Sequence, residues 1–561
     1  MEKAKRLLRG LSIGAGTYSA AALGVMAWPA SGYLALCFGG LYCSRGIKKR
    51  LTSMGSAQWA GKKHLKGMLG AKSGLILGRV AGGRELVRLP QAVHTSVFAP
   101  TGVGKGVSCI LPFLLTCPES CVVVDFKGEN AKITAEHRRQ RFGHEVVLLD
   151  PYNVVNAASD TLNPFDFIDR NSRHAIDDCN DLANALVVRT GEEHERHWND
   201  SAEACIAAAA AMAVTLDDKT MRSLTTVRDI LSHPKNLELA VTAMMESPYW
   251  DGALKQMGGQ LLFFQDREKA SVVSTALRHL RFLGTPAVAE NVSRSSFDPV
   301  KLRKGKLTAY LILPVDRAQA AQSSGLLRMW IGTLLRACVR CGLEAPGLGR
   351  AHFIIDEAAL VLAGKMESIE NALSLGRGFS IRLQTYWQSI GQLQKCFPQG
   401  QEQTVLSNTN QIFFGINDNG TADYVSNRLG DQTIIVRDGG TSTTTQYGRS
   451  EGGKEASTSF SRSTSSSQNW KQNARRLLQP SELMTLSPRE AITFVPGLPP
   501  IRTRLLRYYE EKWFTGHRGI RALLDEWARF SRCATLCVLL IWLAAFLTPG
   551  AVRALRSLMG R

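Results

Sequence analysis

The sequence predicts an α/β fold with a mainly parallel sheet, interrupted by an all-helical insertion and accompanied by apolar segments at both ends. Three observations predict this organisation. From about His94 onward, short apolar runs alternate with helical stretches. The block Asp169–Asn291 is rich in Ala, Leu, Glu and Arg and lacks β-branched runs. Residues 1–50 contain two apolar stretches.

Composition and charge narrow the class of protein. The chain has 561 residues, 44% of them hydrophobic, and a formal net charge of +20. Such a charge attracts polyanions, either nucleic acid or an anionic membrane face. The alternative is that the excess of positive charge only reflects membrane-flanking arginines. The twelve cysteines form no disulfide framework, which indicates a reducing compartment. Cys338 and Cys341 form a C-x-x-C without a second pair, so a zinc site is not predicted.

Residues 1–50 are predicted to be a membrane anchor. The stretches Leu11–Trp28 and Tyr33–Cys43 are apolar, and clusters of Lys and Arg lie on both outer sides of the pair. The positive-inside rule therefore favours a hairpin with both ends in the cytoplasm. The second stretch is short for a span, which needs about 20 residues, so one or two transmembrane helices both fit.

Residues 512–561 form a C-terminal amphipathic and hydrophobic segment. An amphipathic stretch, Arg518–Phe530, precedes the apolar run Cys533–Gly550. Basic residues flank this run on both sides and do not orient it. A membrane span and an interfacial segment both fit the pattern.

The body between these ends divides into alternating parts. Residues 51–168 hold the first predicted strands, in "HTSVFAP", "SCVVVDF" and "HEVVLLDP", and residues 169–291 form the helical insertion. Strands resume in residues 292–437 with "LTAYLILP", "AHFIIDEAA", "SIRLQTYWQ" and "QIFFGI". Residues 438–474 are dominated by Ser, Thr and Gly and are predicted to be a flexible loop. Residues 475–511 supply the last pair of strands.

The stretch "APTGVGKGVSC", Ala99–Cys109, resembles a phosphate-binding loop. In such a loop, backbone N–H groups and a helix start surround the phosphates, and a lysine reaches the terminal ones. Lys105 has the expected place, and the predicted nucleotide-binding residues are Thr101, Gly102, Val103, Gly104, Lys105, Gly106 and Val107. Ala99 replaces the first glycine of the pattern and Gly106 replaces the magnesium-binding hydroxyl, so Mg²⁺ must find another contact, with Thr101 or Ser108 as candidates.

The run "AHFIIDEAA" supplies the acidic half of the same site. It is an apolar strand ending in Asp356 and Glu357. Asp356 is predicted to hold Mg²⁺ through water, and Glu357 to polarise the attacking water. The alternative is a buried strand followed by an acidic helix N-cap, which the upstream loop makes less attractive.

Two polar residues flank the next predicted strand. Arg377 precedes "SIRLQTYWQ" and Gln388 follows it. Gln388 is placed to sense a γ-phosphate, and Arg377 to reach a neighbouring subunit's nucleotide as an arginine finger. Surface positions for both are the alternative.

Together these segments resemble the coupling proteins of type IV secretion and conjugal transfer systems, the TraG/TraD-like family. The resemblance follows nearly the whole cytoplasmic part, through "HTSVFAPTGVGKGVSCILPFLL", "SCVVVDFKGENAKITAEHRR", "HWNDSAEA", "FIIDEAA", "LGRGFSIRLQTYWQSIGQL" and "LQPSELMTL". It implies a membrane-anchored, hexameric, RecA-like ATPase that uses ATP and Mg²⁺. In that family glycine often follows the loop lysine. The resemblance also implies catalytic roles for Lys105, Asp356, Glu357, Gln388 and Arg377.

The function implied is delivery of DNA–protein (relaxosome) or protein substrates to a type IV secretion channel at the bacterial inner membrane, with most of the chain in the cytoplasm. The insertion would be the all-α domain that receives substrate. Without a DNA-reading motif, DNA binding should be insensitive to sequence. A substrate receptor or scaffold with little motor activity is the alternative. A cell-division DNA translocase fits less well, because of the insertion and the lack of a winged-helix tail.

Three features depart from the family pattern. The segment between the two N-terminal apolar stretches is very short, the C-terminal apolar run is unusual, and the Ser/Thr-rich segment is long and without an evident role.

Overall fold

A computed structural model describes residues 51–80, 83, 85–90, 94–189, 196–318, 324–362, 366–450, 457–511 and 514. Contacts divide the chain into two compact units. The larger unit holds Gln58–Leu429 and the chain from Leu478 onward, and the smaller unit holds the chain up to Ala57 together with Gly430–Leu477.

The larger unit is built on one sheet, to which eleven of the described strands belong. Seven run parallel in the order β9-β3-β8-β7-β4-β6-β5, and β12, β13, β1 and β2 continue the sheet from β9 as antiparallel strands. Their bounds are β1 Leu75–Val80, β2 Leu86–Leu89, β3 Thr95–Phe98, β4 Ser120–Asp125, β5 Glu145–Leu149, β6 Leu307–Ile312, β7 Ala351–Ile355, β8 Ile381–Trp387, β9 Asn410–Phe414, β12 Glu490–Phe494 and β13 Ile501–Arg504. The predicted α/β fold with a large parallel sheet is confirmed.

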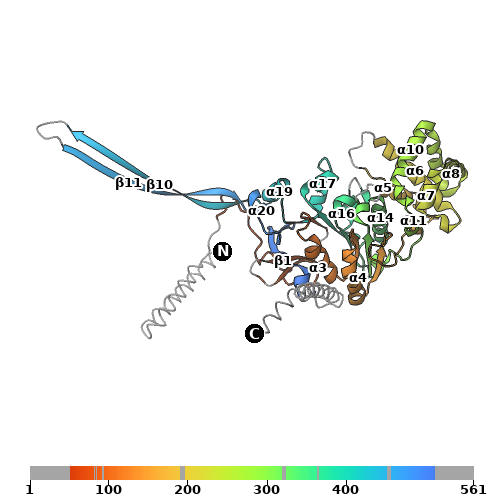
Figure 1. Ribbon diagram of the computed structural model, residues 1–561, viewed down its shortest axis with the longest axis horizontal. Coiled ribbons are helices and arrows are strands. Elements are labelled where there is room, and N and C mark those ends of the chain that lie inside the picture. The colour runs from red at the N-terminus through yellow and green to blue at the C-terminus, as the bar shows by residue number, and fades with distance from the viewer. Residues whose placement is uncertain are drawn as a thin grey trace, which may run out of the picture. The chain divides into compact units, whose positions relative to one another are not determined.

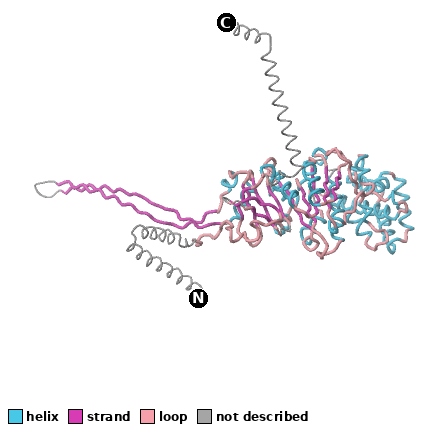
Figure 2. The backbone as a smooth tube through the Cα atoms, turned by 90° about the horizontal axis from the view of Figure 1, so that it is seen from below, coloured by secondary structure: helices cyan, strands magenta, loops and turns pink. Residues whose placement is uncertain are grey.

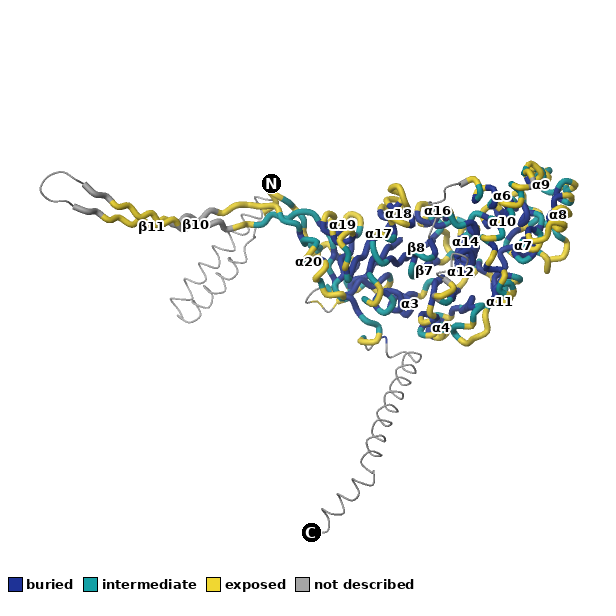
Figure 3. The backbone as a smooth tube through the Cα atoms, turned by 45° about the horizontal axis from the view of Figure 1, so that its top comes forward, coloured by how far each residue is buried: buried dark blue, intermediate teal, exposed yellow. Residues whose placement is uncertain are grey.

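The parallel strands are buried on both faces because helices cover them. Every residue of β4, β6, β7 and β8 is buried, and Figure 3 shows β7 and β8 in the colour of buried residues. β4, β6 and β7 are mostly apolar for that reason, unlike the alternating pattern of a sheet with one wet face. β8 differs, because it also buries Arg382, Gln384 and Thr385.

Helices of the α/β body lie between these strands in the chain (Figure 1). A π-helical turn, Gly106–Ile110, leads directly into α3 (Leu111–Thr116). The others are α4 Glu129–Phe142, α12 Lys301–Lys304, α13 Val315–Ala318, α14 Ser324–Arg340, α15 Ala358–Val361, α16 Glu367–Leu375, α17 Ile390–Cys396, α18 Glu402–Asn408, α19 Asn419–Leu429 and α20 Pro480–Met484, with 3₁₀ turns at Pro164–Phe167 and Tyr508–Glu510.

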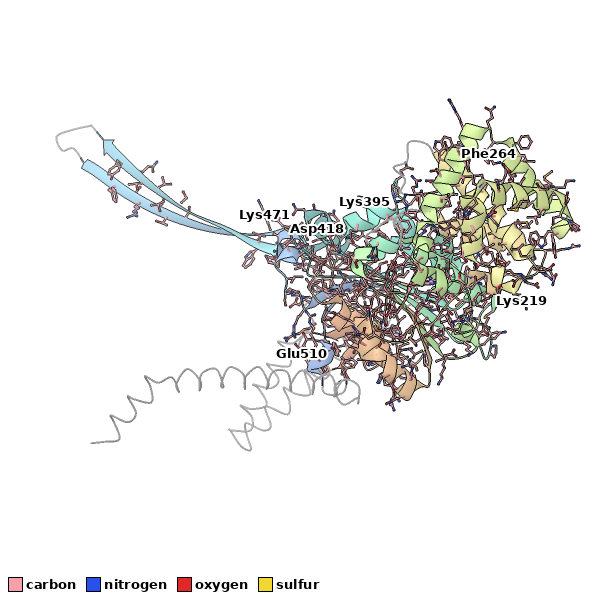
Figure 4. All side chains as sticks on the ribbon, turned by 45° about the vertical axis from the view of Figure 1, so that its right-hand side comes forward. Lys219, Phe264, Lys395, Asp418, Lys471 and Glu510 are labelled. Carbon is pink, nitrogen blue, oxygen red and sulfur yellow. The ribbon has the colours of Figure 1, made fainter. Side chains whose placement is uncertain are left out.

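Between β5 and β6 the described chain is helical. Its elements are α5 Ala175–Leu186, α6 Arg196–Thr215, α7 Leu224–Ser232, α8 Pro234–Glu246, α9 Ala253–Phe263, α10 Asp266–His279 and α11 Pro286–Asn291, with 3₁₀ turns at Lys219–Met221, Tyr249–Gly252 and Arg281–Gly284. The alanine-rich α6 packs against α5, α9 and α10, since small side chains allow close helix approach. Figure 1 shows α6, α7, α8 and α10 grouped together, and Lys219 and Phe264 are labelled in this group in Figure 4.

A short hydrogen-bonded neck joins this helical block to the sheet. The Leu162 N–H donates to Asn291 O at 2.9 Å, and the Ser296 N–H donates to Thr161 O at 3.0 Å. The Asn163 amide donates to Ser293 O at 3.2 Å. Because the chain leaves and returns at one place, the helical block can be inserted without disturbing the pairing of β5 with β6.

The smaller unit contains a long two-stranded ribbon where the sequence predicted a flexible loop. β10 (Asp431–Ser450) and β11 (Ser457–Arg476) pair antiparallel over twenty consecutive positions, from Asp431 opposite Arg476 to Ser450 opposite Ser457 (Figure 2). The prediction of a flexible loop for 438–474 was wrong, because it considered only whether these residues could build a core. Strand pairing needs no core, and the threonines of this segment favour an extended backbone.

Membrane segments are not among the described helices. No helix in the described ranges combines the length and the apolar character needed to cross a bilayer. The predicted anchor within residues 1–50 and the run Cys533–Gly550 lie outside those ranges.

A fully buried arginine ties the first helices to the sheet. Arg138 of α4 is 0% exposed. Its guanidinium donates to Leu114 O at 2.7 Å, Cys117 O at 2.9 Å and Glu119 O at 2.6 Å, and to the Thr308 hydroxyl at 2.6 Å. These carbonyls end α3 and begin β4, so one side chain fixes the segment that follows the glycine-rich loop.

We expect Arg138→Met to destabilise the protein by about 3 kcal/mol or more, because three buried carbonyls lose their donor. The measurement is the thermal unfolding midpoint of the purified chain, followed by circular dichroism. Arg139→Met is the matched control: Arg139 is the next residue of the same helix, with its side chain 44% exposed and paired with Glu136. Equal midpoints for the two variants would contradict a structural role for Arg138.

Candidate nucleotide-binding site

The glycine-rich loop lies at the carboxyl end of β3, as the sequence predicted. The Ala99 N–H donates to Trp387 O of the neighbouring β8 at 2.9 Å, which anchors the start of the loop. Gly102 and Gly104 have φ of +84° and +96°, backbone angles that residues other than glycine rarely adopt. The Lys105 Nζ turns back and donates to Ala99 O at 2.9 Å, and Lys105 is 7% exposed.

A second cation supports this loop from a segment distant in sequence. Arg507, which follows β13, donates from Nη2 to Val103 O at 2.8 Å. Its guanidinium lies so close to Gly104 that a Cβ there would overlap it. The backbone angle therefore favours glycine at 104, and any larger residue there would also displace the Arg507 guanidinium. Sequence reasoning missed Arg507, because nothing local marks an arginine that packs on a loop about 400 residues away.

The acidic pair lies at the carboxyl end of β7. Glu357 has φ 45° and ψ 53°, a left-handed conformation that is uncommon for residues with a side chain. Its N–H donates to Asp356 Oδ1 at 3.0 Å. This turn carries a strain of about 1–3 kcal/mol of the kind that persists where the surroundings hold a functional group in place. It directs Glu357 Oε1 to 3.5 Å from Lys105 Nζ.

Gln388 completes the cluster from the carboxyl end of β8. Its Nε2 donates to Glu357 Oε2 at 3.0 Å, while its backbone N–H donates to Gln392 Oε1 at 2.9 Å. Because β8 lies between β3 and β7 in the sheet, the three strands bring Lys105, Glu357 and Gln388 into one hydrogen-bonded and ionic chain. The structure therefore brings together four of the predicted catalytic residues, counting Asp356 beside Glu357.

These residues border one cavity of about 490 Å³, a volume typical of ligand pockets. Six of the seven predicted loop residues line it, the exception being Val103. The lining residues are Pro100, Thr101, Gly102, Gly104, Lys105, Gly106, Val107, Leu111, Asp125, Phe126, Lys127, Glu129, Asn130, Asp356, Glu357, Ala359, Leu360, Gln388 and Gln392.

The segment after β4 adds polar groups that the sequence analysis did not assign to the site. Asp125 is 3% exposed and its Oδ2 accepts from the Ala131 N–H at 2.9 Å. Burial raises the pKa of Asp125 above its ordinary value. The signal was present in the sequence, since charged residues follow a buried strand that lies beside β7. Parallel neighbours end at the same edge of a sheet.

The two candidate hydroxyls for Mg²⁺ differ in position. Thr101 is exposed and borders the cavity, whereas Ser108 is 1% exposed and does not line it. The donor set fits a Mg²⁺–nucleotide: backbone N–H groups and Lys105 suit phosphates, and the carboxylates of Asp356 and Asp125 suit a hard cation. With Gly106 in the usual hydroxyl position, Thr101 is the hydroxyl available at the cavity surface.

Arg377 does not belong to this cavity. It precedes the amino end of β8, while Gln388 follows the carboxyl end, and a seven-residue strand spans about 23 Å. Arg377 borders a separate cavity of about 280 Å³, beside Arg350 and Arg382. A direct role on its own chain's nucleotide is therefore not supported, and a role on a neighbouring copy remains a proposal.

Comparisons with known proteins agree with this fold. Residues 48–526 match the family model described as type IV secretory system conjugative DNA transfer. Conjugal transfer protein TraG of Rhizobium radiobacter is 30% identical over 421 residues, which cover 73% of this chain and 61% of that protein. A TraG of Escherichia coli is 25% identical over 521 residues, covering 83% of this chain and 78% of the relative.

Among solved structures, the plasmid coupling protein TrwB in complex with the ATP analogue ADPNP has a TM-score of 0.57 at 17% identity, covering 82% of this chain and 95% of TrwB. At that identity the likeness concerns the fold. The family match covers far more than half of the chain. The chain belongs to the type IV secretory system conjugative DNA transfer family, as its sequence motifs predicted.

The buried Asp356 gives this site a testable pH dependence. Burial, and then the neighbouring Glu357 carboxylate, raises the pKa of Asp356 from 3.8 to about 6, although Lys105 opposes the shift. A carboxyl with a raised pKa binds more protons when folded. Its contribution to stability is therefore greatest at low pH, falls as pH rises from about 4 to about 6, and stays low above that.

We expect Asp356→Asn to stabilise the ligand-free protein near neutral pH by about 1–3 kcal/mol, because the uncharged amide avoids the cost of a buried carboxylate. The gain should vanish toward about pH 4, where the native carboxyl is protonated. Unfolding midpoints across this pH range test both points. Asp316→Asn, at a side chain 73% exposed, is the control and should show no such gain. A pH-independent difference for Asp356→Asn would contradict the assignment.

Proposed function

We propose that this chain is an ATPase of conjugal transfer, which binds ATP with Mg²⁺ and uses its hydrolysis to deliver DNA–protein or protein substrates to a type IV secretion channel. One observation carries the proposal. Lys105, Glu357 and Gln388 converge from the carboxyl ends of three adjacent parallel strands on one cavity of about 490 Å³. Carboxyl ends of parallel strands are the usual location of nucleotide sites.

The loop would hold the phosphates. Backbone N–H groups of Gly102–Val107 and the start of the following helix offer donors, and Lys105 adds a positive charge. Lys105 contacts Ala99 O and Glu357. Phosphate oxygens would replace these partners, which frees the Glu357 carboxylate. Nucleotide binding and release of the catalytic base are then one event.

Asp356 and Thr101 would hold the Mg²⁺ ion, which neutralises charge that develops on the phosphates. Glu357 would accept a proton from the attacking water, as its strained backbone turn aims it at the cavity. Gln388 donates to Glu357 at 3.0 Å and would exchange that bond for one to a terminal phosphate. The hydrogen-bond partner of Gln388 would thus depend on whether the terminal phosphate is bound.

The relatives support this reading. TrwB has been solved with ADPNP and with ADP and Mg²⁺. The TraG relatives are conjugal transfer proteins, although the matched region spans only 61% and 59% of the two rhizobial and agrobacterial TraG chains. The net charge of +20 suits a polyanionic cargo such as DNA. We further propose a homo-hexamer at the inner membrane, which is how Arg377 would reach a neighbour's nucleotide.

Lys105→Ala should abolish ATP hydrolysis and weaken nucleotide binding, whereas Glu357→Gln should abolish hydrolysis and retain binding, since the amide keeps the shape but cannot accept a proton. Turnover of the purified full-length chain, with and without DNA, measures the first effect, and a fluorescent nucleotide analogue measures the second. Glu136→Gln, at an exposed side chain on α4, is the control. Binding without turnover in the wild type would instead favour a substrate receptor with little motor activity.

Arg377→Ala should leave nucleotide binding intact and reduce turnover by a factor of about 10³ or more, the range found for arginine fingers. Mixing Arg377→Ala chains with Lys105→Ala chains should restore part of the turnover, because mixed neighbours complete one site between them. Arg382→Ala, at the same end of β8, is the matched control. Absence of any recovery on mixing, despite co-assembly, would assign Arg377 a structural role.

A further inference from the structure

The β10–β11 ribbon has two chemically distinct faces. In an antiparallel pair, directly opposed residues share a face and alternate positions along a strand share that face. The pairs Thr443–Thr464, Thr445–Arg462 and Tyr447–Phe460 therefore lie on one face. The pairs Ser442–Ser465, Thr444–Ser463 and Gln446–Ser461 lie on the other. We call the first the aromatic face and the second the serine face.

The aromatic face holds the large exposed rings of the ribbon. Tyr447 is 81% exposed, Phe460 is 62% exposed and Trp470 is 66% exposed. Trp470 is ten residues from Phe460 on β11, so it has the same parity and the same face. Tyr447 and Phe460 contact each other edge to face, with ring centroids 5.2 Å apart. The serine face shows no aromatic residue among its described positions.

The ribbon is also positively charged on both faces. Among its described side chains four are basic and one is acidic: Arg462 and Arg476 lie on the aromatic face with Asp431, and Lys471 and Arg475 lie on the serine face. The single carboxylate lies 3.5 Å from Arg476. Arg462 stands directly beside the Tyr447–Phe460 pair on the aromatic face. Figure 4 shows side chains projecting from the ribbon, on which Lys471 is labelled, and Figure 3 shows much of the ribbon in the colour of exposed residues.

Exposed rings, an adjacent arginine and a row of threonine hydroxyls form a surface that suits single-stranded nucleic acid. Bases stack on aromatic side chains regardless of sequence, arginine attracts phosphates and stacks on bases, and hydroxyls donate to phosphate oxygens. A protein partner would be expected to meet a large apolar patch, whereas polar residues separate the Tyr447–Phe460 pair from Trp470 along the strand. The spacing from Phe460 to Trp470 corresponds to about 33 Å of strand.

We propose that the aromatic face of the β10–β11 ribbon binds the single-stranded DNA that this protein transfers, with Tyr447, Phe460 and Trp470 as stacking positions and Arg462 as a phosphate contact. This rests on the proposed function as far as the cargo is concerned. The assignment of the ribbon as the binding surface rests on its exposed rings, its threonine hydroxyls and Arg462. It gives the Ser/Thr-rich segment a role in holding the strand, separate from the nucleotide cavity.

The test compares the two faces in the full-length chain. In the aromatic-face variant, Tyr447, Phe460 and Trp470 are each replaced by Leu, which keeps apolar bulk and removes the ring. In the serine-face variant, Gln446, Ser461 and Ser463 are each replaced by Ala. Affinity for a fluorescein-labelled oligothymidylate is read by anisotropy. We expect a loss of about tenfold or more for the aromatic face and almost none for the serine face.

Two further readouts locate the contact. Arg462→Gln should weaken binding and lower the slope of log affinity against log salt by about one. Photocrosslinking with bromodeoxyuridine DNA should give adducts on peptides containing Tyr447, Phe460 or Trp470. Equal loss in both face variants, or no loss in either, would overturn the proposal. So would an aromatic-face variant that changes the oligomeric state and leaves DNA affinity intact, because the face would then bind another copy of the chain.

Failure of the proposed function remains distinguishable from failure of this inference. ATP turnover without DNA is measured on the wild type and on the serine-face variant. Absent turnover would contradict the proposed ATPase, while the affinity comparison between the two faces would still decide the ribbon's role. Retained turnover with equal DNA affinity in all variants would contradict the ribbon assignment alone.

Discussion

In a parallel sheet buried on both faces, a charged side chain must either be paired or lie at a strand end, and the candidate site depends on this constraint. β3, β4, β7 and β8 lie side by side, and every residue of these strands is buried. The charged residues that follow them have one edge of the sheet in common. Lys105, Asp125, Asp356 and Gln388 meet there although they are far apart in the chain. The chemistry of the site follows from strand order as much as from the motifs.

Within that edge, charges balance one another in the absence of ligand. Glu357 contacts Lys105 and accepts a hydrogen bond from Gln388, while Asp356 is buried beside them with a pKa raised to about 6. Arg507 adds a cation beneath the loop. A triphosphate brings several negative charges and would compete for Lys105, while a divalent cation would relieve the crowding of Asp356 and Glu357.

The sequence predicted the parts of this site that obey local rules. A strand, a glycine-rich turn and a helix define the loop, and an apolar run ending in Asp356 and Glu357 defines its partner, so both could be placed before the fold was known. Gln388 could be placed because it ends the next strand. Arg507 could not be placed, since its contact with the loop depends on long-range packing. Arg377 could have been separated from the cavity, because it precedes the strand that Gln388 follows. The ribbon was missed because the prediction used only composition, which indicates whether a segment can form a core. Composition does not show whether two segments can pair as strands, as β10 and β11 do.

The polar composition of the β10–β11 ribbon limits how much its own contacts can stabilise it. An isolated two-stranded hairpin is at best marginally stable in water. The twenty pairs of β10 and β11 run without a register shift, and among the described residues Ser56 bridges to Gln432 near one end of the ribbon. Toward the other end, the described side chains are Ser, Thr, Gln and Arg462, together with the Tyr447–Phe460 ring contact. A ligand that contacts the ribbon would add to the free energy that offsets the cost of ordering this length of backbone. A strand of DNA stacked along the aromatic face would supply both stacking energy and charge neutralisation at the place where the ribbon's own contacts are weakest.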